Sequence, residues 1–137
     1  MFFKENKDQN EDLIKIAALL IHAAKIDENF SIEEEKIIEE ALLNLGASKG
    51  SVKEIIVESK IIEGNANQIL EFTKEVKNME ESKKIHIIET LWRIIYSNKD
   101  ADIYETNLMR RLAGLMYIDN KTMGDIKEKI KNKNNSL

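Results

Sequence analysis

The chain has 137 residues, the size of a single domain, and its net charge of −4 argues against general nucleic-acid binding, which needs a basic face. With no proline and only five glycines, few positions oppose helix, so we expect one all-α domain over residues 1–137, with its core at 11–131 and a frayed basic tail at 132–137. The absence of cysteine excludes disulfides and thiolate chemistry and fits a reducing, cytoplasmic setting.

Three helices are predicted in the first half of the chain. The segment from about Glu11 to Ile26 is apolar on nearly every side, which indicates a central helix, and its apolar part is too short to span a bilayer. Ser31 is the expected N-cap of a second helix, because Glu34 completes a capping box, and Gly46 is expected to end it. A third helix is predicted from about Lys49 to Ile62. The buried stripe of the second helix is expected to contain Ile32, Ile37, Ile38, Ala41, Leu42 and Leu45.

The second half of the chain repeats this pattern. Leu20 to Ser59 aligns without a gap on the segment that begins 71 residues later. The repeated positions are mainly caps and core residues: Ser31 and Glu34 of the first copy correspond to Asp102 and Glu105 of the second. Such a repeat specifies a fold better than a function, because caps and core positions say little about a ligand.

Four further helices complete the prediction. The fourth, about Ala66 to Asn78, links the two copies. The fifth, Ser82 to Ser97, corresponds to the first apolar helix, a sixth starts after the Asp102 cap, and Asp119 or Asn120 opens the seventh. We therefore expect an all-α bundle of about seven helices, in which two pseudo-repeated three-helix units are joined by a linking helix and the two apolar helices pack together at the centre.

Two strings in the chain carry a resemblance to a known family. The string IAALLIHAAKIDENFSIEEEKIIEEAL resembles the first half of the tellurite-resistance TerB family, where an apolar helix leads through a turn into an acidic helix start. The string LWRIIYSNKDADIYETNLMRRLAGLMYID resembles its second half, so the resemblance covers roughly residues 11–131. The same domain type occurs in DjlA-like co-chaperones, but this chain has no His-Pro-Asp signature. The resemblance implies a bacterial source, an all-helical fold and no established catalytic activity.

The resemblance also implies a divalent-cation site, for calcium or magnesium, at the turns that follow the two apolar helices. Carried over by position, this site falls on Asp27 and Glu34 in the first unit and on Asn98 and Glu105 in the second. The second unit is the weaker candidate, because Asn98 replaces the aspartate and Arg93 stands five residues before it.

Both turns also carry oxygen-bearing side chains at alternate positions, and such side chains can converge on a hard cation. The sixth and twelfth positions of a complete calcium loop, however, hold Ile32 and Ile38 in the first unit. Ser31 and Asp102 stand at helix starts, where backbone N–H groups would occupy their oxygens as caps. We therefore favour structural caps over a weak cation site. The candidate ligands of the latter are Asp27, Asn29, Glu34 and Glu35, with Asn98, Asp100 and Glu105 as the weaker set.

Charged residues suggest surfaces for protein partners. The segment from Asp27 to Glu40 is rich in acids, and we interpret it either as a solvated helix face or as a docking surface for a basic partner through Glu34, Glu35 and Glu39. Arg110 and Arg111 offer the opposite charge and could pair across a dimer or bind an acidic ligand; the alternative is an ordinary surface pair.

The leading hypothesis is a non-enzymatic, cytoplasmic TerB-like module that binds an unidentified protein partner in a stress-response (tellurite-resistance-like) or envelope-associated complex. The alternative is a dedicated divalent-metal-binding or sensing protein that uses the Asp27 to Glu35 turn. A small enzyme is the least favoured hypothesis, because His22 with Asp27 is the one conceivable acid-base pair. Neither a cofactor, nucleic-acid binding nor direct membrane insertion is predicted, and the oligomeric state is left open.

Overall fold

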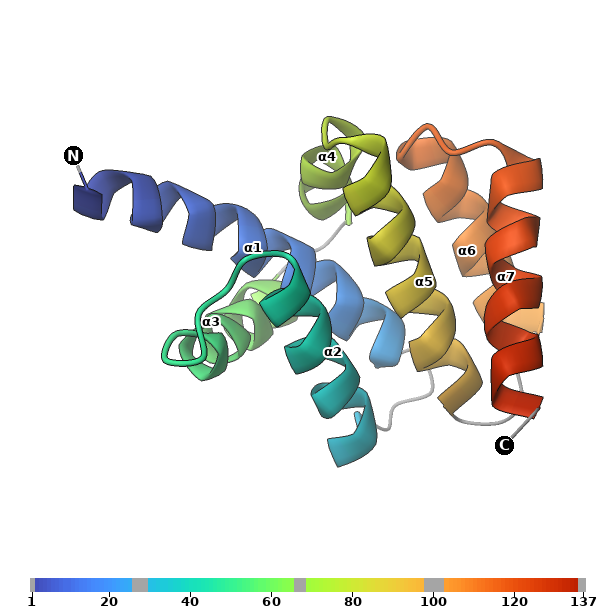
Figure 1. Ribbon diagram of the computed structural model, residues 1–137, viewed down its shortest axis with the longest axis horizontal. Helices are drawn as coiled ribbons and strands as arrows, with labels where there is room; N and C mark the ends of the chain where they lie inside the picture. Colours follow the sequence, from blue (N-terminus) through green and yellow to red (C-terminus); the bar gives the residue numbers. More distant parts are fainter. Residues whose placement is uncertain (1, 26–29, 66–68, 98–102, 136–137) are drawn as a thin grey trace.

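The computed structural model describes the backbone of residues 2–25, 30–65, 69–97 and 103–135, and the side chains of residues 10–25, 30–65, 69–97 and 107–133. Within these ranges the regular structure consists of seven helices and no strand, which confirms the predicted all-α fold (Figure 1). The helices are α1 (Phe2–Ala24), α2 (Ile32–Asn44), α3 (Val52–Asn65), α4 (Leu70–Lys77), α5 (Glu81–Ser97), α6 (Ile103–Leu115) and α7 (Asn120–Asn135).

Two helices are longer than the sequence indicates. α1 begins at Phe2 rather than near Glu11, and its first turns extend beyond the packed helices (Figure 1). Apolar periodicity identifies only the packed part of a helix, and the residues before Glu11 include neither proline nor glycine to stop it. For the same reason α7 continues to Asn135, through residues 132–135 that were expected to fray.

The apolar helices α1 and α5 pack against each other at the centre of the bundle, as predicted. α1 also contacts α2, α3 and α4, and α5 contacts α2, α4 and α7. The core is continuous across both units, and its largest fully buried side chains are Trp92 of α5 and Phe72 of α4. None of the helices in the described part of the chain is both long enough and apolar enough to cross a membrane.

The buried face of α2 differs from the predicted stripe at one end. Ile38, Ala41 and Leu42 are buried as expected, but the side chain of Ile32 is 73% exposed. At about 100° per residue, Ile32 lies roughly opposite the centre of the buried face, so its assignment to the core was wrong.

Gly46 terminates α2, as predicted, in the position after the C-cap Leu45. The φ angle of this glycine is 114°, a conformation that side-chain-bearing residues rarely adopt. The N–H of Gly46 donates to the carbonyl of Leu43, and the N–H of Ala47 donates to that of Leu42 at 2.9 Å. These two bonds form a Schellman closure, which satisfies carbonyl groups at the helix end.

α6 ends with the same closure 71 residues later, but without a glycine. Tyr117 takes the left-handed conformation, with φ of 57°, and the N–H of Ile118 donates to the carbonyl of Ala113 at 2.9 Å. The buried ammonium group of Lys84, near the start of α5, donates to the carbonyl of Met116 at 3.2 Å. A cation at the carboxyl end of α6 complements the helix dipole and fixes the chain next to Tyr117.

Candidate functional site

The structure leaves the geometry of the predicted cation sites open. Four of the candidate ligands lie outside the described residues: Asp27, Asn29, Asn98 and Asp100. The side chain of Glu105 lies outside them as well. Among the side chains that are described, no three or more His, Asp or Glu residues form a group that could hold a metal ion. The cation site therefore remains a prediction.

Glu34 has a structural task at the start of α2. Its backbone N–H donates to the Ser31 hydroxyl at 3.1 Å, and the Ser31 backbone N–H donates to Glu34 Oε1 at 2.9 Å, which confirms the predicted capping box. The side chain of Glu34 is 0% exposed. A docked partner cannot reach a carboxylate buried at a helix start, so Glu34 has to be removed from the predicted docking set.

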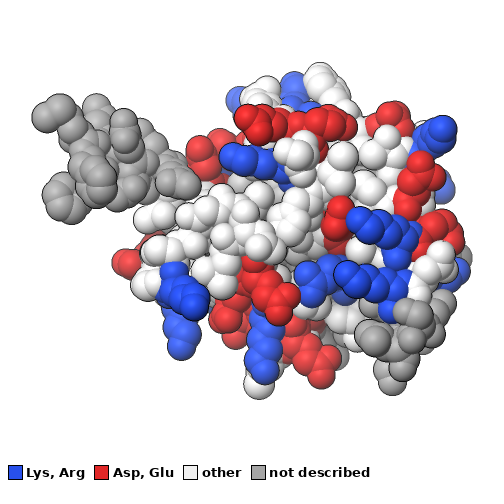
Figure 2. Space-filling view, viewed as in Figure 1, with Lys and Arg blue, Asp and Glu red and all other residues white. Residues whose placement is uncertain are grey.

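Four other glutamates remain accessible on α2, and we call them the α2 acidic surface: Glu33, Glu35, Glu39 and Glu40. In Figure 2, acidic side chains gather over this helix, with lysine and arginine side chains among them. Exposed Ile32 lies in the same first turn as Glu33 and Glu35 and adds apolar area.

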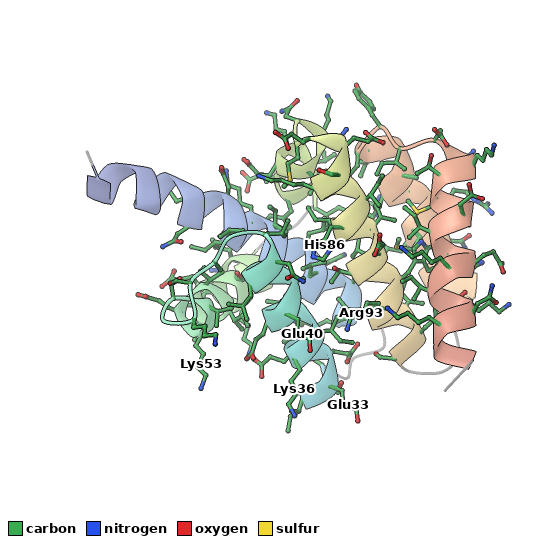
Figure 3. All side chains as sticks on the ribbon, in the orientation of Figure 1. Glu33, Lys36, Glu40, Lys53, His86 and Arg93 are labelled. Atoms are coloured by element: carbon green, nitrogen blue, oxygen red, sulfur yellow. The ribbon has the colours of Figure 1, made fainter. Side chains whose placement is uncertain are left out.

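Basic residues of neighbouring helices hold two of these carboxylates. Lys60 of α3 lies 2.9 Å from Glu35 Oε1, and Arg93 of α5 lies 3.1 Å from Glu40 Oε2. Figure 3 shows Glu33, Lys36 and Glu40 along α2, with Arg93 reaching towards α2 from α5. These pairs are solvent-exposed, so each contributes at most about 1 kcal/mol to stability. Sequence reasoning had connected Arg93 with the second turn, whereas in the structure it pairs with the first unit.

His22 has a carboxylate neighbour that sequence reasoning missed. Its Nδ1 lies 3.4 Å from Glu63 Oε1 at the end of α3, and Lys25 Nζ lies 2.7 Å from Glu63 Oε2. The side chain of Glu63 is 9% exposed. This cluster ties the end of α1 to the end of α3. No sequence signal pointed to Glu63, since the contact depends on how these two helices pack.

Arg110 and Arg111 are both exposed, and Arg110 borders a pocket that Arg111 does not line. This pocket, of about 470 Å³, lies between α5, α6 and α7, and its lining includes Trp92, Met109, Met123 and Lys127. Trp92 is thus both buried and part of a pocket wall. A second pocket of about 300 Å³ lies beside the first packed residues of α1.

The start of α7 confirms the expected cap. Asp119 Oδ1 accepts a hydrogen bond from the backbone N–H of Thr122 at 2.7 Å. This bond to the charged carboxylate lowers the pKa of Asp119.

Tyr96, stacked on Trp92 with ring centres 5.9 Å apart, has a raised pKa because of burial and the nearby charge of Glu128.

Comparison with known proteins identifies one family. The model of the family described as tellurite resistance protein TerB matches residues 13–128. No curated protein and no solved structure matches the chain significantly.

Proposed function

The chain belongs to the tellurite-resistance TerB family, and on that premise we propose that it is a non-enzymatic, cytoplasmic module that binds a protein partner in a stress-response or envelope-associated complex. The partner presents a basic segment, which docks on the α2 acidic surface. This family supplies a helical scaffold, so the function has to come from groups on the scaffold's surface.

The observation that carries this proposal is the concentration of acidic side chains on α2. Four carboxylates are accessible on one helix, and two of them, Glu35 and Glu40, pair with Lys60 and Arg93. Exposed Ile32, at 73%, supplies an apolar contact beside them. A surface with this composition favours a partner that combines lysine or arginine with an apolar side chain, because complementary charge speeds association and an apolar contact slows dissociation.

A charge-reversal pair tests this proposal. Glu33→Lys with Glu39→Lys changes the surface but spares the capping box and both ion pairs. The matched control, Glu54→Lys with Glu58→Lys, reverses two exposed charges on α3. Each tagged variant would be expressed in its native host, cross-linked and purified, and its circular dichroism compared with that of the original chain.

A specific set of cross-linked proteins should disappear with the α2 variant and remain with the α3 control. The same interaction should weaken as salt is raised from about 50 to 300 mM, because screening reduces the attraction between exposed charges. Equal capture by both variants, or equal loss from both, would exclude the α2 acidic surface as the docking site.

A further inference from the structure

The pocket between α5, α6 and α7 differs in character from the α2 acidic surface. Its volume of about 470 Å³ lies within the range of pockets that hold a small ligand or one large side chain of a partner. The three helices that form it are those of the second unit (Figure 1). The first unit carries the α2 acidic surface, so the two surfaces can act independently.

The apolar part of the pocket consists of Trp92 and two methionines. Trp92 is 2% exposed, Met109 1% and Met123 6%. Methionine is flexible and polarisable, so a wall of this kind adapts to different apolar side chains. The indole Nε1 of Trp92 is buried and has no hydrogen-bond acceptor among the residues that the structure describes. A buried donor without an acceptor is unfavourable, so Trp92 is held in this position at a cost.

The cationic part of the pocket comes from two helices. Arg110 of α6 is exposed and forms no ion pair with any described residue. Lys127 of α7 lies over the Trp92 ring, with Nζ 5.4 Å from its centre. The two cations therefore favour a ligand that carries a carboxylate.

Gly124 forms part of the same wall, in the interior of α7. A glycine inside a helix lowers its stability, and crowding does not explain this one, because a Cβ placed at Gly124 would meet nothing within 4 Å. The missing side chain keeps the pocket open. A larger residue at this position would therefore extend into the pocket.

We propose that this pocket binds an acidic segment of a partner protein. The segment lays a large apolar side chain over the hollow beside Gly124, whose floor is formed by Trp92, Met109 and Met123, and places carboxylates against Arg110 and Lys127. The wide opening and the position of the cations on two different helices suit a peptide that crosses the groove. This site has the opposite charge preference to the α2 acidic surface, so the module would connect a basic and an acidic partner.

The chain's single tryptophan makes the site directly observable, because the indole N–H signal and the tryptophan emission both report on Trp92 alone. The probe is the peptide Ac-Glu-Asp-Phe-Glu-NH2, titrated into the full chain. The comparison peptides are Ac-Gln-Asn-Phe-Gln-NH2, Ac-Glu-Asp-Ala-Glu-NH2 and Ac-Lys-Lys-Phe-Lys-NH2. We expect a saturable shift of both signals, with a dissociation constant of about 1 mM or tighter, for the acidic phenylalanine peptide.

Two variants and one control connect the signal to the pocket. Arg110→Glu and Gly124→Leu should each weaken binding about tenfold or more, as expected for a lost charge contact or a blocked pocket. Arg111→Glu changes the adjacent exposed arginine, which does not line the pocket, and should leave binding unchanged.

The proposal is overturned if the acidic peptide causes no saturable shift, if the neutral or basic peptide binds as tightly, or if Arg110→Glu and Arg111→Glu behave alike. A shift of the indole signal with protein concentration alone would also overturn it, since the occupant would then be a second copy of the chain. None of these outcomes depends on the α2 acidic surface, so the two proposals can fail separately.

Discussion

The two three-helix units share a backbone plan but differ in the residues that complete it. α2 and α6 have the same length and occupy positions 71 residues apart, and both end in a Schellman closure. In the first unit the left-handed position is Gly46, while in the second it is Tyr117, which is 71% exposed. The first unit presents carboxylates on its surface, and the second presents a tryptophan-lined pocket with two cations. The fold thus tolerates different residues at equivalent positions of the two units, and the two units present different surfaces.

The largest expected effect comes from equivalent positions in the two central helices. Trp92 corresponds to Ile21 in the repeat, and both are buried, at 2% and 0% exposure. Trp92→Ala should lower the free energy of unfolding by about 3–5 kcal/mol and Ile21→Ala by about 2–5 kcal/mol, because each leaves a cavity. Urea denaturation followed by circular dichroism measures both. One cooperative transition is expected in each variant, and separate unfolding of the second unit would contradict a shared core.

The two helix ends should respond in opposite directions to substitution. Gly46→Ala should lower the free energy of unfolding by about 1–2 kcal/mol, because alanine is strained at a positive φ. Tyr117→Gly should raise it by up to about 1 kcal/mol, since the relief of strain exceeds the lost contact between the ring and Lys77, whose Nζ lies 4.4 Å from the ring centre. Thermal unfolding measures both changes. A destabilised Tyr117→Gly would mean that the ring contributes more than the strain costs.

The residues that precede α3 and α7 predict a smaller, pH-dependent difference. Asp119 corresponds to Ser48, whose hydroxyl lies 2.8 Å from that of Ser51 and carries no charge at any pH. The pKa of Asp119 is lowered on folding, so its contribution is complete above the unfolded value and is lost as pH falls through the folded value. Below about pH 4 the start of α7 should therefore open before that of α3. Amide exchange at Thr122 and Ser51 measures this difference, which Asp119→Ser should abolish.

The smallest expected effect concerns divalent cations. If the predicted weak site exists, calcium or magnesium should move backbone amide signals between Asp27 and Glu35 more than those between Asn98 and Glu105, since the first copy retains more acidic residues. A titration into the millimolar range measures this. Equal shifts at both turns would indicate nonspecific screening, and no shift would remove the site.

Interactions between neighbouring residues could be predicted from the sequence, and those between distant ones could not. The Ser31–Glu34 capping box and the Gly46 end of α2 involve residues within one turn, so residue type and spacing were sufficient. The contacts of Glu63 with His22 and Lys25 connect residues about 40 positions apart, which depends on the packing of α1 on α3.

The candidate sites show the same limit. The exposed glutamates of α2 follow from composition, but the burial of Glu34 depends on its cap. The pocket was not predicted, because Trp92, Arg110 and Gly124 come from three different helices. A tryptophan in an apolar helix is usually a core residue, and only the arrangement of α6 and α7 places it beside an opening.

The hydrogen bond between Lys84 and the Met116 carbonyl has an evolutionary consequence. The residue 71 positions before Lys84 is Leu13 of α1, which is 4% exposed, and the first unit has a glycine at the corresponding helix end. The first unit thus combines an apolar residue at the start of its central helix with a glycine at the end of the next helix. The second unit combines a lysine with a tyrosine at these positions. Mutations at these two positions would be tolerated more easily together than singly. Among relatives of this chain, those with glycine at position 117 should more often carry an apolar residue at position 84.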